Sequence, residues 1–116
     1  MLTNLTLVNT QITSNTIQLI AGNTTGTATF RIYPNIEPFK SWNNISWVKS
    51  SGTGTITCTI KRVSDGSVID TNIANPKDLS AEPLALEYID FVFTLTQVSG
   101  NNPILNSIQL ILQGGF

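Results

Sequence analysis

Hydrophobic and polar residues alternate along much of this chain, most regularly between residues 55 and 62. There threonine fills most of one set of positions, and Ile56, Cys58 and Ile60 fill the other. Successive side chains of a β-strand point to opposite faces, so a period of two predicts a strand with one buried face. Residues 28–32 and 89–95 repeat the pattern. The alternation therefore favours packed antiparallel sheets.

Turn-forming residues separate these strands. Ser-Asp-Gly-Ser at residues 64–67 predicts a hairpin, with Asp65 and Gly66 supplying the positive φ values of a tight primed turn. Two prolines in residues 33–39 predict a segment that crosses an edge of a sandwich, because proline cannot donate to a strand ladder. Residues 9–15 are predicted to be a polar connection, and residues 76–79 a single helical turn.

The remaining pattern predicts one all-β domain over residues 1–116. No segment of ten or more residues shows a helical stripe of apolar positions. We expect an antiparallel two-sheet β-sandwich (jelly roll) of about eight strands. They are expected at residues 5–8, 16–20, 27–32, 44–49, 55–62, 68–71, 86–97 and 107–112. The side chains expected to meet between the sheets are Phe30, Ile45, Trp47, Ile56, Cys58, Ile60, Ile89, Phe91, Phe93, Leu95, Ile108 and Leu110.

Charge is scarce in this sequence. Only 11% of residues are charged, and six basic residues nearly balance seven acidic ones, whereas an average domain has about 25% charged residues. Strong attraction to nucleic acid or to anionic lipid is therefore not expected. Insertion into a membrane is not expected either, because no stretch approaches the roughly 18 consecutive apolar residues of a membrane span. The 12 asparagines and 16 threonines supply a neutral, hydrogen-bonding surface instead. Such a surface can contact a protein or a glycan with little charge to desolvate.

The sequence offers few residues for catalysis. It has no histidine, and its single cysteine, Cys58, lies on the apolar face of its strand and can form no disulfide within the chain. Glu87 and Asp90 are three residues apart on a predicted strand, so they face opposite ways. The acidic residues are scattered: Glu37, Asp65, Asp70, Asp78, Glu82, Glu87 and Asp90. We expect no enzymatic activity, cofactor or metal site, although a structural calcium ion stays open as an alternative.

Aromatic side chains are the best candidates for binding contacts. Tyr33 and Trp42 flank the proline-containing crossover, and either could belong to the core edge or to an exposed contact. Tyr88 is out of phase with the apolar set of its strand and is predicted to face outward. Trp47 shares a face with Ile45 and is predicted to lie in the core. The candidate ligand or interface contacts are therefore Tyr33, Trp42 and Tyr88.

The order of several segments resembles a known group of modules. These segments are residues 26–30, residues 39–47, the alternating strand, residues 86–95 and residues 102–108. Their succession is similar to the jelly-roll modules of the galactose-binding-like (discoidin-like) group, found in bacteriophage tail and baseplate proteins and in microbial surface proteins. The resemblance covers residues 17–112. It implies a two-sheet sandwich, and it implies binding or assembly rather than catalysis.

Two functions from different classes fit these observations. The first is a structural protein of a virion (phage tail, baseplate or capsid-associated), made in the host cytoplasm without a signal peptide, that forms homo-oligomers or contacts other virion proteins. The second is a carbohydrate-binding module of a surface protein or glycan-processing enzyme, which would bind a glycan at the cell surface as part of a larger chain. We favour the first, because the sequence places no aromatic platform beside amide or charged partners.

Overall fold

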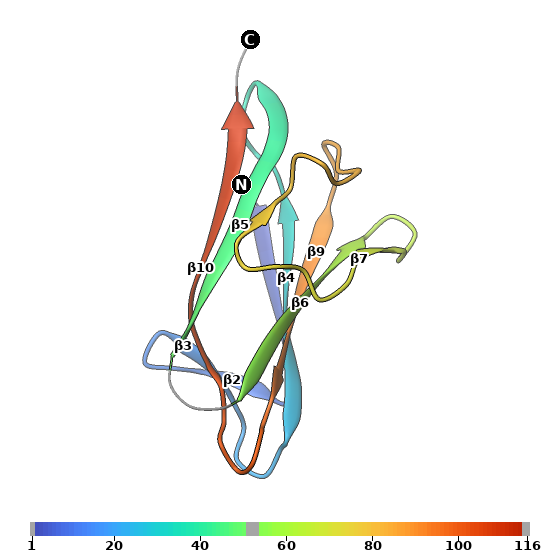
Figure 1. The fold of residues 1–116 in the computed structure, drawn as a ribbon. Helices are drawn as coiled ribbons and strands as arrows, with labels where there is room; N and C mark the ends of the chain where they lie inside the picture. The colour runs from blue at the N-terminus through green and yellow to red at the C-terminus, as the bar shows by residue number, and fades with distance from the viewer. Residues whose placement is uncertain (1, 51–53, 115–116) are drawn as a thin grey trace.

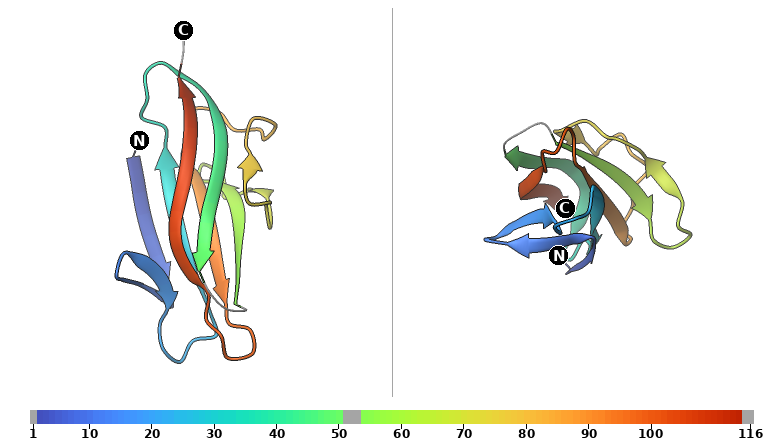
Figure 2. Two further views of the ribbon diagram at one scale, coloured as in Figure 1. Left: turned by 60° about the vertical axis from the view of Figure 1, so that its left-hand side comes forward. Right: turned by 90° about the horizontal axis from the view of Figure 1, so that it is seen from below.

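The computed structural model describes residues 2–50 and 54–114, and this part of the chain folds into ten strands with no helix (Figure 1). The strands are β1 (Leu2–Val8), β2 (Thr10–Thr13), β3 (Thr16–Leu19), β4 (Thr25–Tyr33), β5 (Phe39–Ser50), β6 (Thr55–Arg62), β7 (Val68–Asp70), β8 (Lys77–Asp78), β9 (Ile89–Thr96) and β10 (Ile104–Gly114). They form two five-stranded antiparallel sheets that pack face to face (Figure 2). The protein is therefore an antiparallel β-sandwich, as predicted.

The strand order is that of a jelly roll extended by two strands. One sheet has the order β1-β4-β9-β6-β7, and the other has the order β2-β3-β10-β5-β8. From β3 onward the strands pair as nested hairpins, β3 with β10, β4 with β9, β5 with β8 and β6 with β7. This arrangement of eight strands in two sheets is a jelly roll. β1 and β2 each add one strand to the edge of a sheet. The two strands that the sequence did not predict are the short strands β2 and β8.

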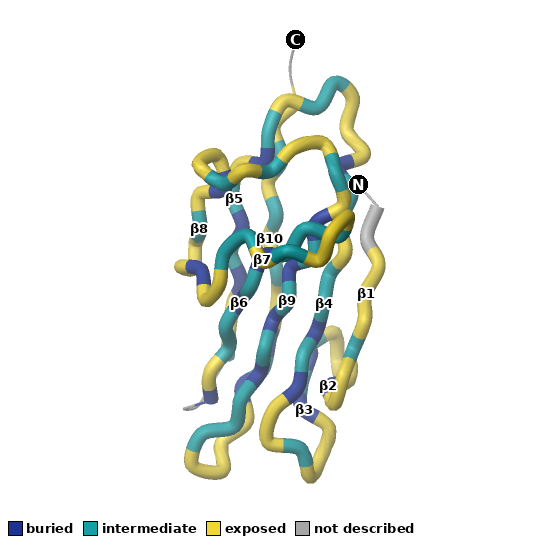
Figure 3. The backbone as a smooth tube through the Cα atoms, turned by 90° about the vertical axis from the view of Figure 1, so that its right-hand side faces the viewer, coloured by how far each residue is buried: buried dark blue, intermediate teal, exposed yellow. Residues whose placement is uncertain are grey.

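The core lies between the two sheets and has the predicted composition. Buried and half-buried residues alternate along the whole of β9 (Figure 3). All twelve side chains predicted to meet between the sheets belong to the core or pack against it. Phe30, Ile56, Ile108 and Leu110 are partly buried, Trp47 is 8% exposed, and the other seven are fully buried. The period of two thus assigned each strand to the correct face.

Two local predictions were wrong. Residues 76–79 form no helical turn, because Lys77 and Asp78 pair with Ile45 and Asn44 as the short strand β8. Residues 9–15 are not simply a polar connection, because Thr10–Thr13 within them form strand β2. β2 begins at the buried Thr10, whose hydroxyl donates to the carbonyl oxygen of Thr27 at 2.8 Å. This hydrogen bond lets a polar segment enter a sheet without an unsatisfied buried hydroxyl.

The hairpin between β6 and β7 is confirmed, but its turn differs from the prediction. Of the two central residues only Gly66 has a positive φ, at 73°. The loop is closed by Asp65, whose carboxylate accepts hydrogen bonds from the amide and hydroxyl groups of Ser67 at 2.9 and 2.7 Å. A two-residue turn with both central residues at positive φ occurs instead at Ser14 and Asn15, between β2 and β3.

Candidate functional site

Two of the three predicted contact residues meet at one end of the sandwich. Tyr33 is the last residue of β4, and Tyr88 directly precedes β9. The paired strands bring Ile32 opposite Ile89, so the next residues outward lie beside each other. The two tyrosine rings are in contact, with centroids 4.8 Å apart and planes inclined by 38°. Tyr88 is 43% exposed, which confirms that it faces outward.

The tyrosine pair lies between two hollows in the surface. One is a groove of about 550 Å³ lined by residues 33–39 together with Leu86 and Tyr88. The other, of about 310 Å³, is lined on its far side by residues 63–64 and Glu87. Tyr33, Leu86 and Tyr88 line both hollows, and we call these three residues the aromatic ridge. With Leu86 52% exposed, the ridge presents apolar surface to solvent.

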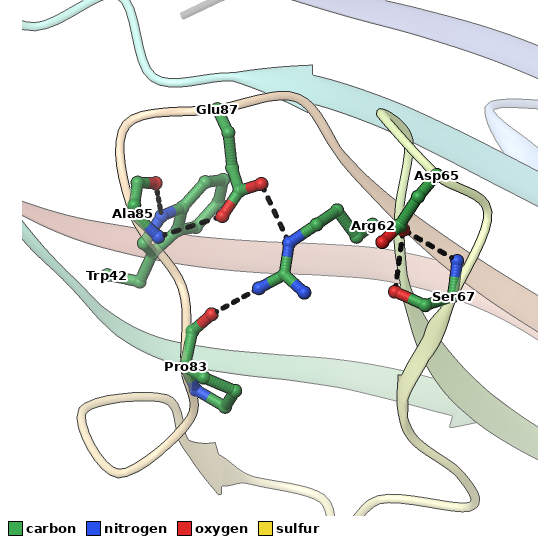
Figure 4. A network of polar contacts seen from close by, with 7 residues as sticks. All are labelled: Trp42, Arg62, Asp65, Ser67, Pro83, Ala85 and Glu87. Atoms are coloured by element: carbon green, nitrogen blue, oxygen red, sulfur yellow. Dashed lines mark hydrogen bonds and ion pairs between the residues drawn. The ribbon is translucent and has the colours of Figure 1, made fainter.

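The backbone beneath the ridge is held by the polar network drawn in Figure 4. Arg62 donates from Nε to the Glu87 carboxylate at 2.9 Å and from a terminal nitrogen to the carbonyl oxygen of Pro83 at 2.6 Å. The second carboxylate oxygen of Glu87 accepts from the amide of Ala85 at 3.2 Å. Arg62 and Glu87 are each about three-quarters shielded from water. The segment that carries Leu86 and Tyr88 is thus attached to the end of β6.

Trp42 does not belong to the exposed site, so this candidate contact was wrong. Its side chain is only 1% exposed and packs against Phe39 and Phe91. Its indole N–H donates to the carbonyl oxygen of Ala85 at 2.7 Å, which satisfies the one polar atom that burial would otherwise strand. Trp42 therefore supports the ridge segment from below and has no free face for a ligand.

Sequence reasoning missed Leu86, Arg62 and the bracing role of Glu87. Leu86 was placed inside a long strand, whereas β9 begins only at Ile89. A signal for the network was present, because an arginine and a glutamate that are paired and only partly exposed stand out in a chain with so few charges. Their separation of 25 residues hides the pairing from any local pattern.

Apart from the aromatic ridge, the described residues show no site with the features of a reactive centre. Burial raises the pKa of the Cys58 thiol to about 12, so the nucleophilic thiolate form is disfavoured. Within residues 2–50 and 54–114, no three His, Cys, Asp or Glu side chains gather as a metal ion would require. The same part of the chain contains no helix long and apolar enough to span a bilayer.

Comparison with known proteins adds no relative: no family model, no curated protein and no solved structure matches this chain. We therefore argue function from the geometry of the aromatic ridge and of the sheet edges.

Proposed function

We propose that this chain is a non-enzymatic assembly module that binds a neighbouring protein through its aromatic ridge. The observation that carries the proposal is the contact between the half-buried Tyr33 and the exposed Tyr88, extended by Leu86 and flanked by two hollows. Tyrosine provides a large contact area at a low cost in conformational entropy and is enriched in interface hot spots. Hollows beside such residues can receive side chains of a partner.

The bracing beneath the ridge supports binding. Arg62, Glu87 and Trp42 hold the segment that presents Leu86 and Tyr88 by hydrogen bonds of 2.6 to 3.2 Å. A surface that is already ordered loses less conformational entropy when a partner binds. The ridge thus combines exposed apolar area with an ordered backbone. Both properties favour binding to a partner.

A protein partner suits the ridge better than a glycan. The two tyrosine rings contact each other at 38°, so they offer no single flat platform for a sugar ring. Exposed aliphatic side chains, Leu86 and Ile36, widen the patch. Of the two carboxylates nearby, Glu87 is already bound to Arg62. Carbohydrate binding stays the alternative, because Asn35 and Glu37 line the same groove as the tyrosines.

The setting that we propose is a virion. The support is the sequence resemblance to modules of phage tails and baseplates, together with a net charge of −1 that does little to keep neighbouring copies apart. In such a particle the module would contact other virion proteins and further copies of itself, without a cofactor.

Site-specific photocrosslinking tests the proposal. A benzophenone amino acid replaces Leu86 in the chain expressed in its native source, and the same residue replaces the exposed Val48 on β5 as the matched control. We expect one discrete protein adduct from position 86 and none from position 48. The partner identified by mass spectrometry, purified and titrated against the chain, should lose at least about tenfold in affinity on Tyr88→Ala.

One outcome would contradict the proposal. If position 86 gives no protein adduct, while the chain is retained on a polysaccharide column and released by Tyr88→Ala, the carbohydrate-binding alternative replaces this proposal.

A further inference from the structure

The charges of this protein are confined to one stretch of the chain. All thirteen charged residues lie between Arg31 and Asp90. The strands β1, β2, β3 and β10 therefore carry none, and these four strands lie together on one side of the sandwich (Figure 2). An uncharged side can approach an identical side without repulsion and without desolvating ions.

β1 forms an unprotected edge on this side. It ends its sheet, is seven residues long and pairs with β4 in unbroken register. It contains neither proline nor a charged residue. Prolines and charged residues are the usual means by which an edge strand is protected from pairing with another chain. The other sheet edges are blunted: β2, β7 and β8 have four, three and two residues. Ion pairs also cover the β7 and β8 edges, since Lys77 lies 3.7 Å from Asp70 and 3.2 Å from Glu82.

An apolar hollow opens directly beside β1. It has a volume of about 320 Å³, and no charged residue lines it. Leu5, Ile12 and Phe30 contribute apolar surface, and Leu5 and Ile12 are 38% and 58% exposed. The hollow exists because β3 pairs with only Ile104 and Leu105 of β10, so the second sheet covers little of the inner face of β1. Exposed apolar surface next to an unprotected edge marks an interaction site.

From the neutral side, the open edge and the hollow, we infer that a second copy of this chain pairs with β1 in antiparallel orientation about a two-fold axis. The sequence of β1 suits such pairing, because a register centred on Leu5 places Leu5 opposite Leu5 and Asn4 opposite Thr6. No position in this register sets like charges against each other. Such an interface is self-complementary, as two-fold symmetry requires.

The pairing also covers the hollow. The two-fold axis of an antiparallel strand pair is perpendicular to the sheet, so the inner faces of both copies lie on the same side of the continuous sheet. The exposed Ile12 and Leu5 of the two copies then approach one another below the junction. Main-chain hydrogen bonds give the pair its register, and the apolar side chains add buried area. This inference rests on the proposed function only in treating the chain as an assembly module; it does not involve the aromatic ridge.

Sedimentation equilibrium of the purified chain over a range of concentrations tests the pairing. Wild type should show a concentration-dependent dimer. Asn4→Lys combined with Thr6→Lys places like charges opposite each other twice, and should weaken dimerisation by about tenfold or more. Asn4→Lys combined with Thr6→Glu places opposite charges in the same two pairs and should restore it. Both positions are exposed. Asn4 lies opposite Arg31 of β4, so circular dichroism and urea titration check that each variant folds as stably as the others.

The matched control adds two lysines elsewhere, by Val48→Lys and Val68→Lys at exposed positions, and should leave the dimer unchanged. A wild-type monomer at every concentration overturns the inference, and so does a dimer that both charge combinations affect equally. Leu86→Ser separates the two proposals. It should abolish the binding of the partner identified by crosslinking and leave the dimer intact, so either proposal can fail without the other.

Discussion

Phe91 lies at the centre of the core. Its ring is fully buried, lies 5.9 Å from that of Trp42 and belongs to the central strand β9. We expect Phe91→Ala to lower the free energy of unfolding by about 3–5 kcal/mol, because it removes apolar contacts and leaves a cavity between two sheets. Urea titration measures the loss. Tyr88→Ala at the exposed end of the same segment should cost far less, and equal losses would mean that the two rings are equally buried.

Cys58 gives the protein a specific response to alkaline pH. Its thiol ionises at about 12 in the folded chain, against an ordinary value of 9.0. Between these values the folded state retains a proton that the unfolded state has released. The free energy of unfolding therefore falls as pH rises from 9.0 towards 12, by up to about 1.4 kcal/mol per pH unit, and is unaffected by this group at lower pH.

Comparison with Cys58→Val isolates this effect. The variant keeps the other titrating groups and lacks the thiol, so the stability of wild type should fall relative to that of the variant as pH rises above 9.0. Urea titrations of both proteins at several pH values measure the difference. Two curves that run parallel through this range would contradict the buried, protonated thiol.

The two tryptophans show how far sequence determines the environment of a single residue. Trp47 and Ile45 lie in a stretch of β5 without a register shift, and the burial of Trp47 could be predicted from phase alone. Trp42 lies beyond a register shift between β5 and β10, so its phase differs from that of Ile45. Its indole N–H also donates to the carbonyl oxygen of Ala85, 43 residues away. A partner so distant leaves no local pattern, so the exposure of Trp42 could not be predicted.

At the scale of elements, the ion pair of Arg62 and Glu87 is one of the contacts that hold the loop before β9. Glu87→Ala removes the bonds to Arg62 and to the amide of Ala85. We expect a loss of about 1 kcal/mol in the free energy of unfolding and faster amide hydrogen exchange at Ala85. Asp90→Ala is the matched control, because it breaks an ion pair outside the loop, that of Asp90 on β9 with Arg31 on β4. Unchanged exchange at Ala85 in Glu87→Ala would show that the ion pair does not hold the loop.

The strands differ in how well sequence predicts them. β6 and β9 bury one face against a whole sheet, so their alternation is strong and was recognised. β2 and β8 lie at edges, are four and two residues long, and show mostly exposed or half-buried positions. Their strand geometry comes from pairing with β3 and β5 rather than from their own burial. Tertiary context of this kind has no local signal.

At the scale of the whole molecule, the jelly roll gathers the uncharged ends of the chain. Residues 1–30 and 91–116 contain no charged side chain. β10 returns beside β3, and β1 and β2 extend both sheets at that side, so two neutral segments far apart in sequence form one side of the sandwich. The candidate site was only partly predictable. Tyr33 and Tyr88 could be chosen as candidate contacts, but their contact with each other required the pairing of β4 with β9.

The central claim is that this chain assembles through neutral surface, and the mass of the purified chain in solution tests it most directly. Sedimentation equilibrium is run with chelator in about 0.1 M and about 1 M NaCl, between which the screening length falls from about 10 Å to about 3 Å. We predict a dimer with the same dissociation constant in both, because no ion pair and no metal holds β1 to its partner. A monomer throughout, or a dimer lost with salt or chelator, would contradict the claim.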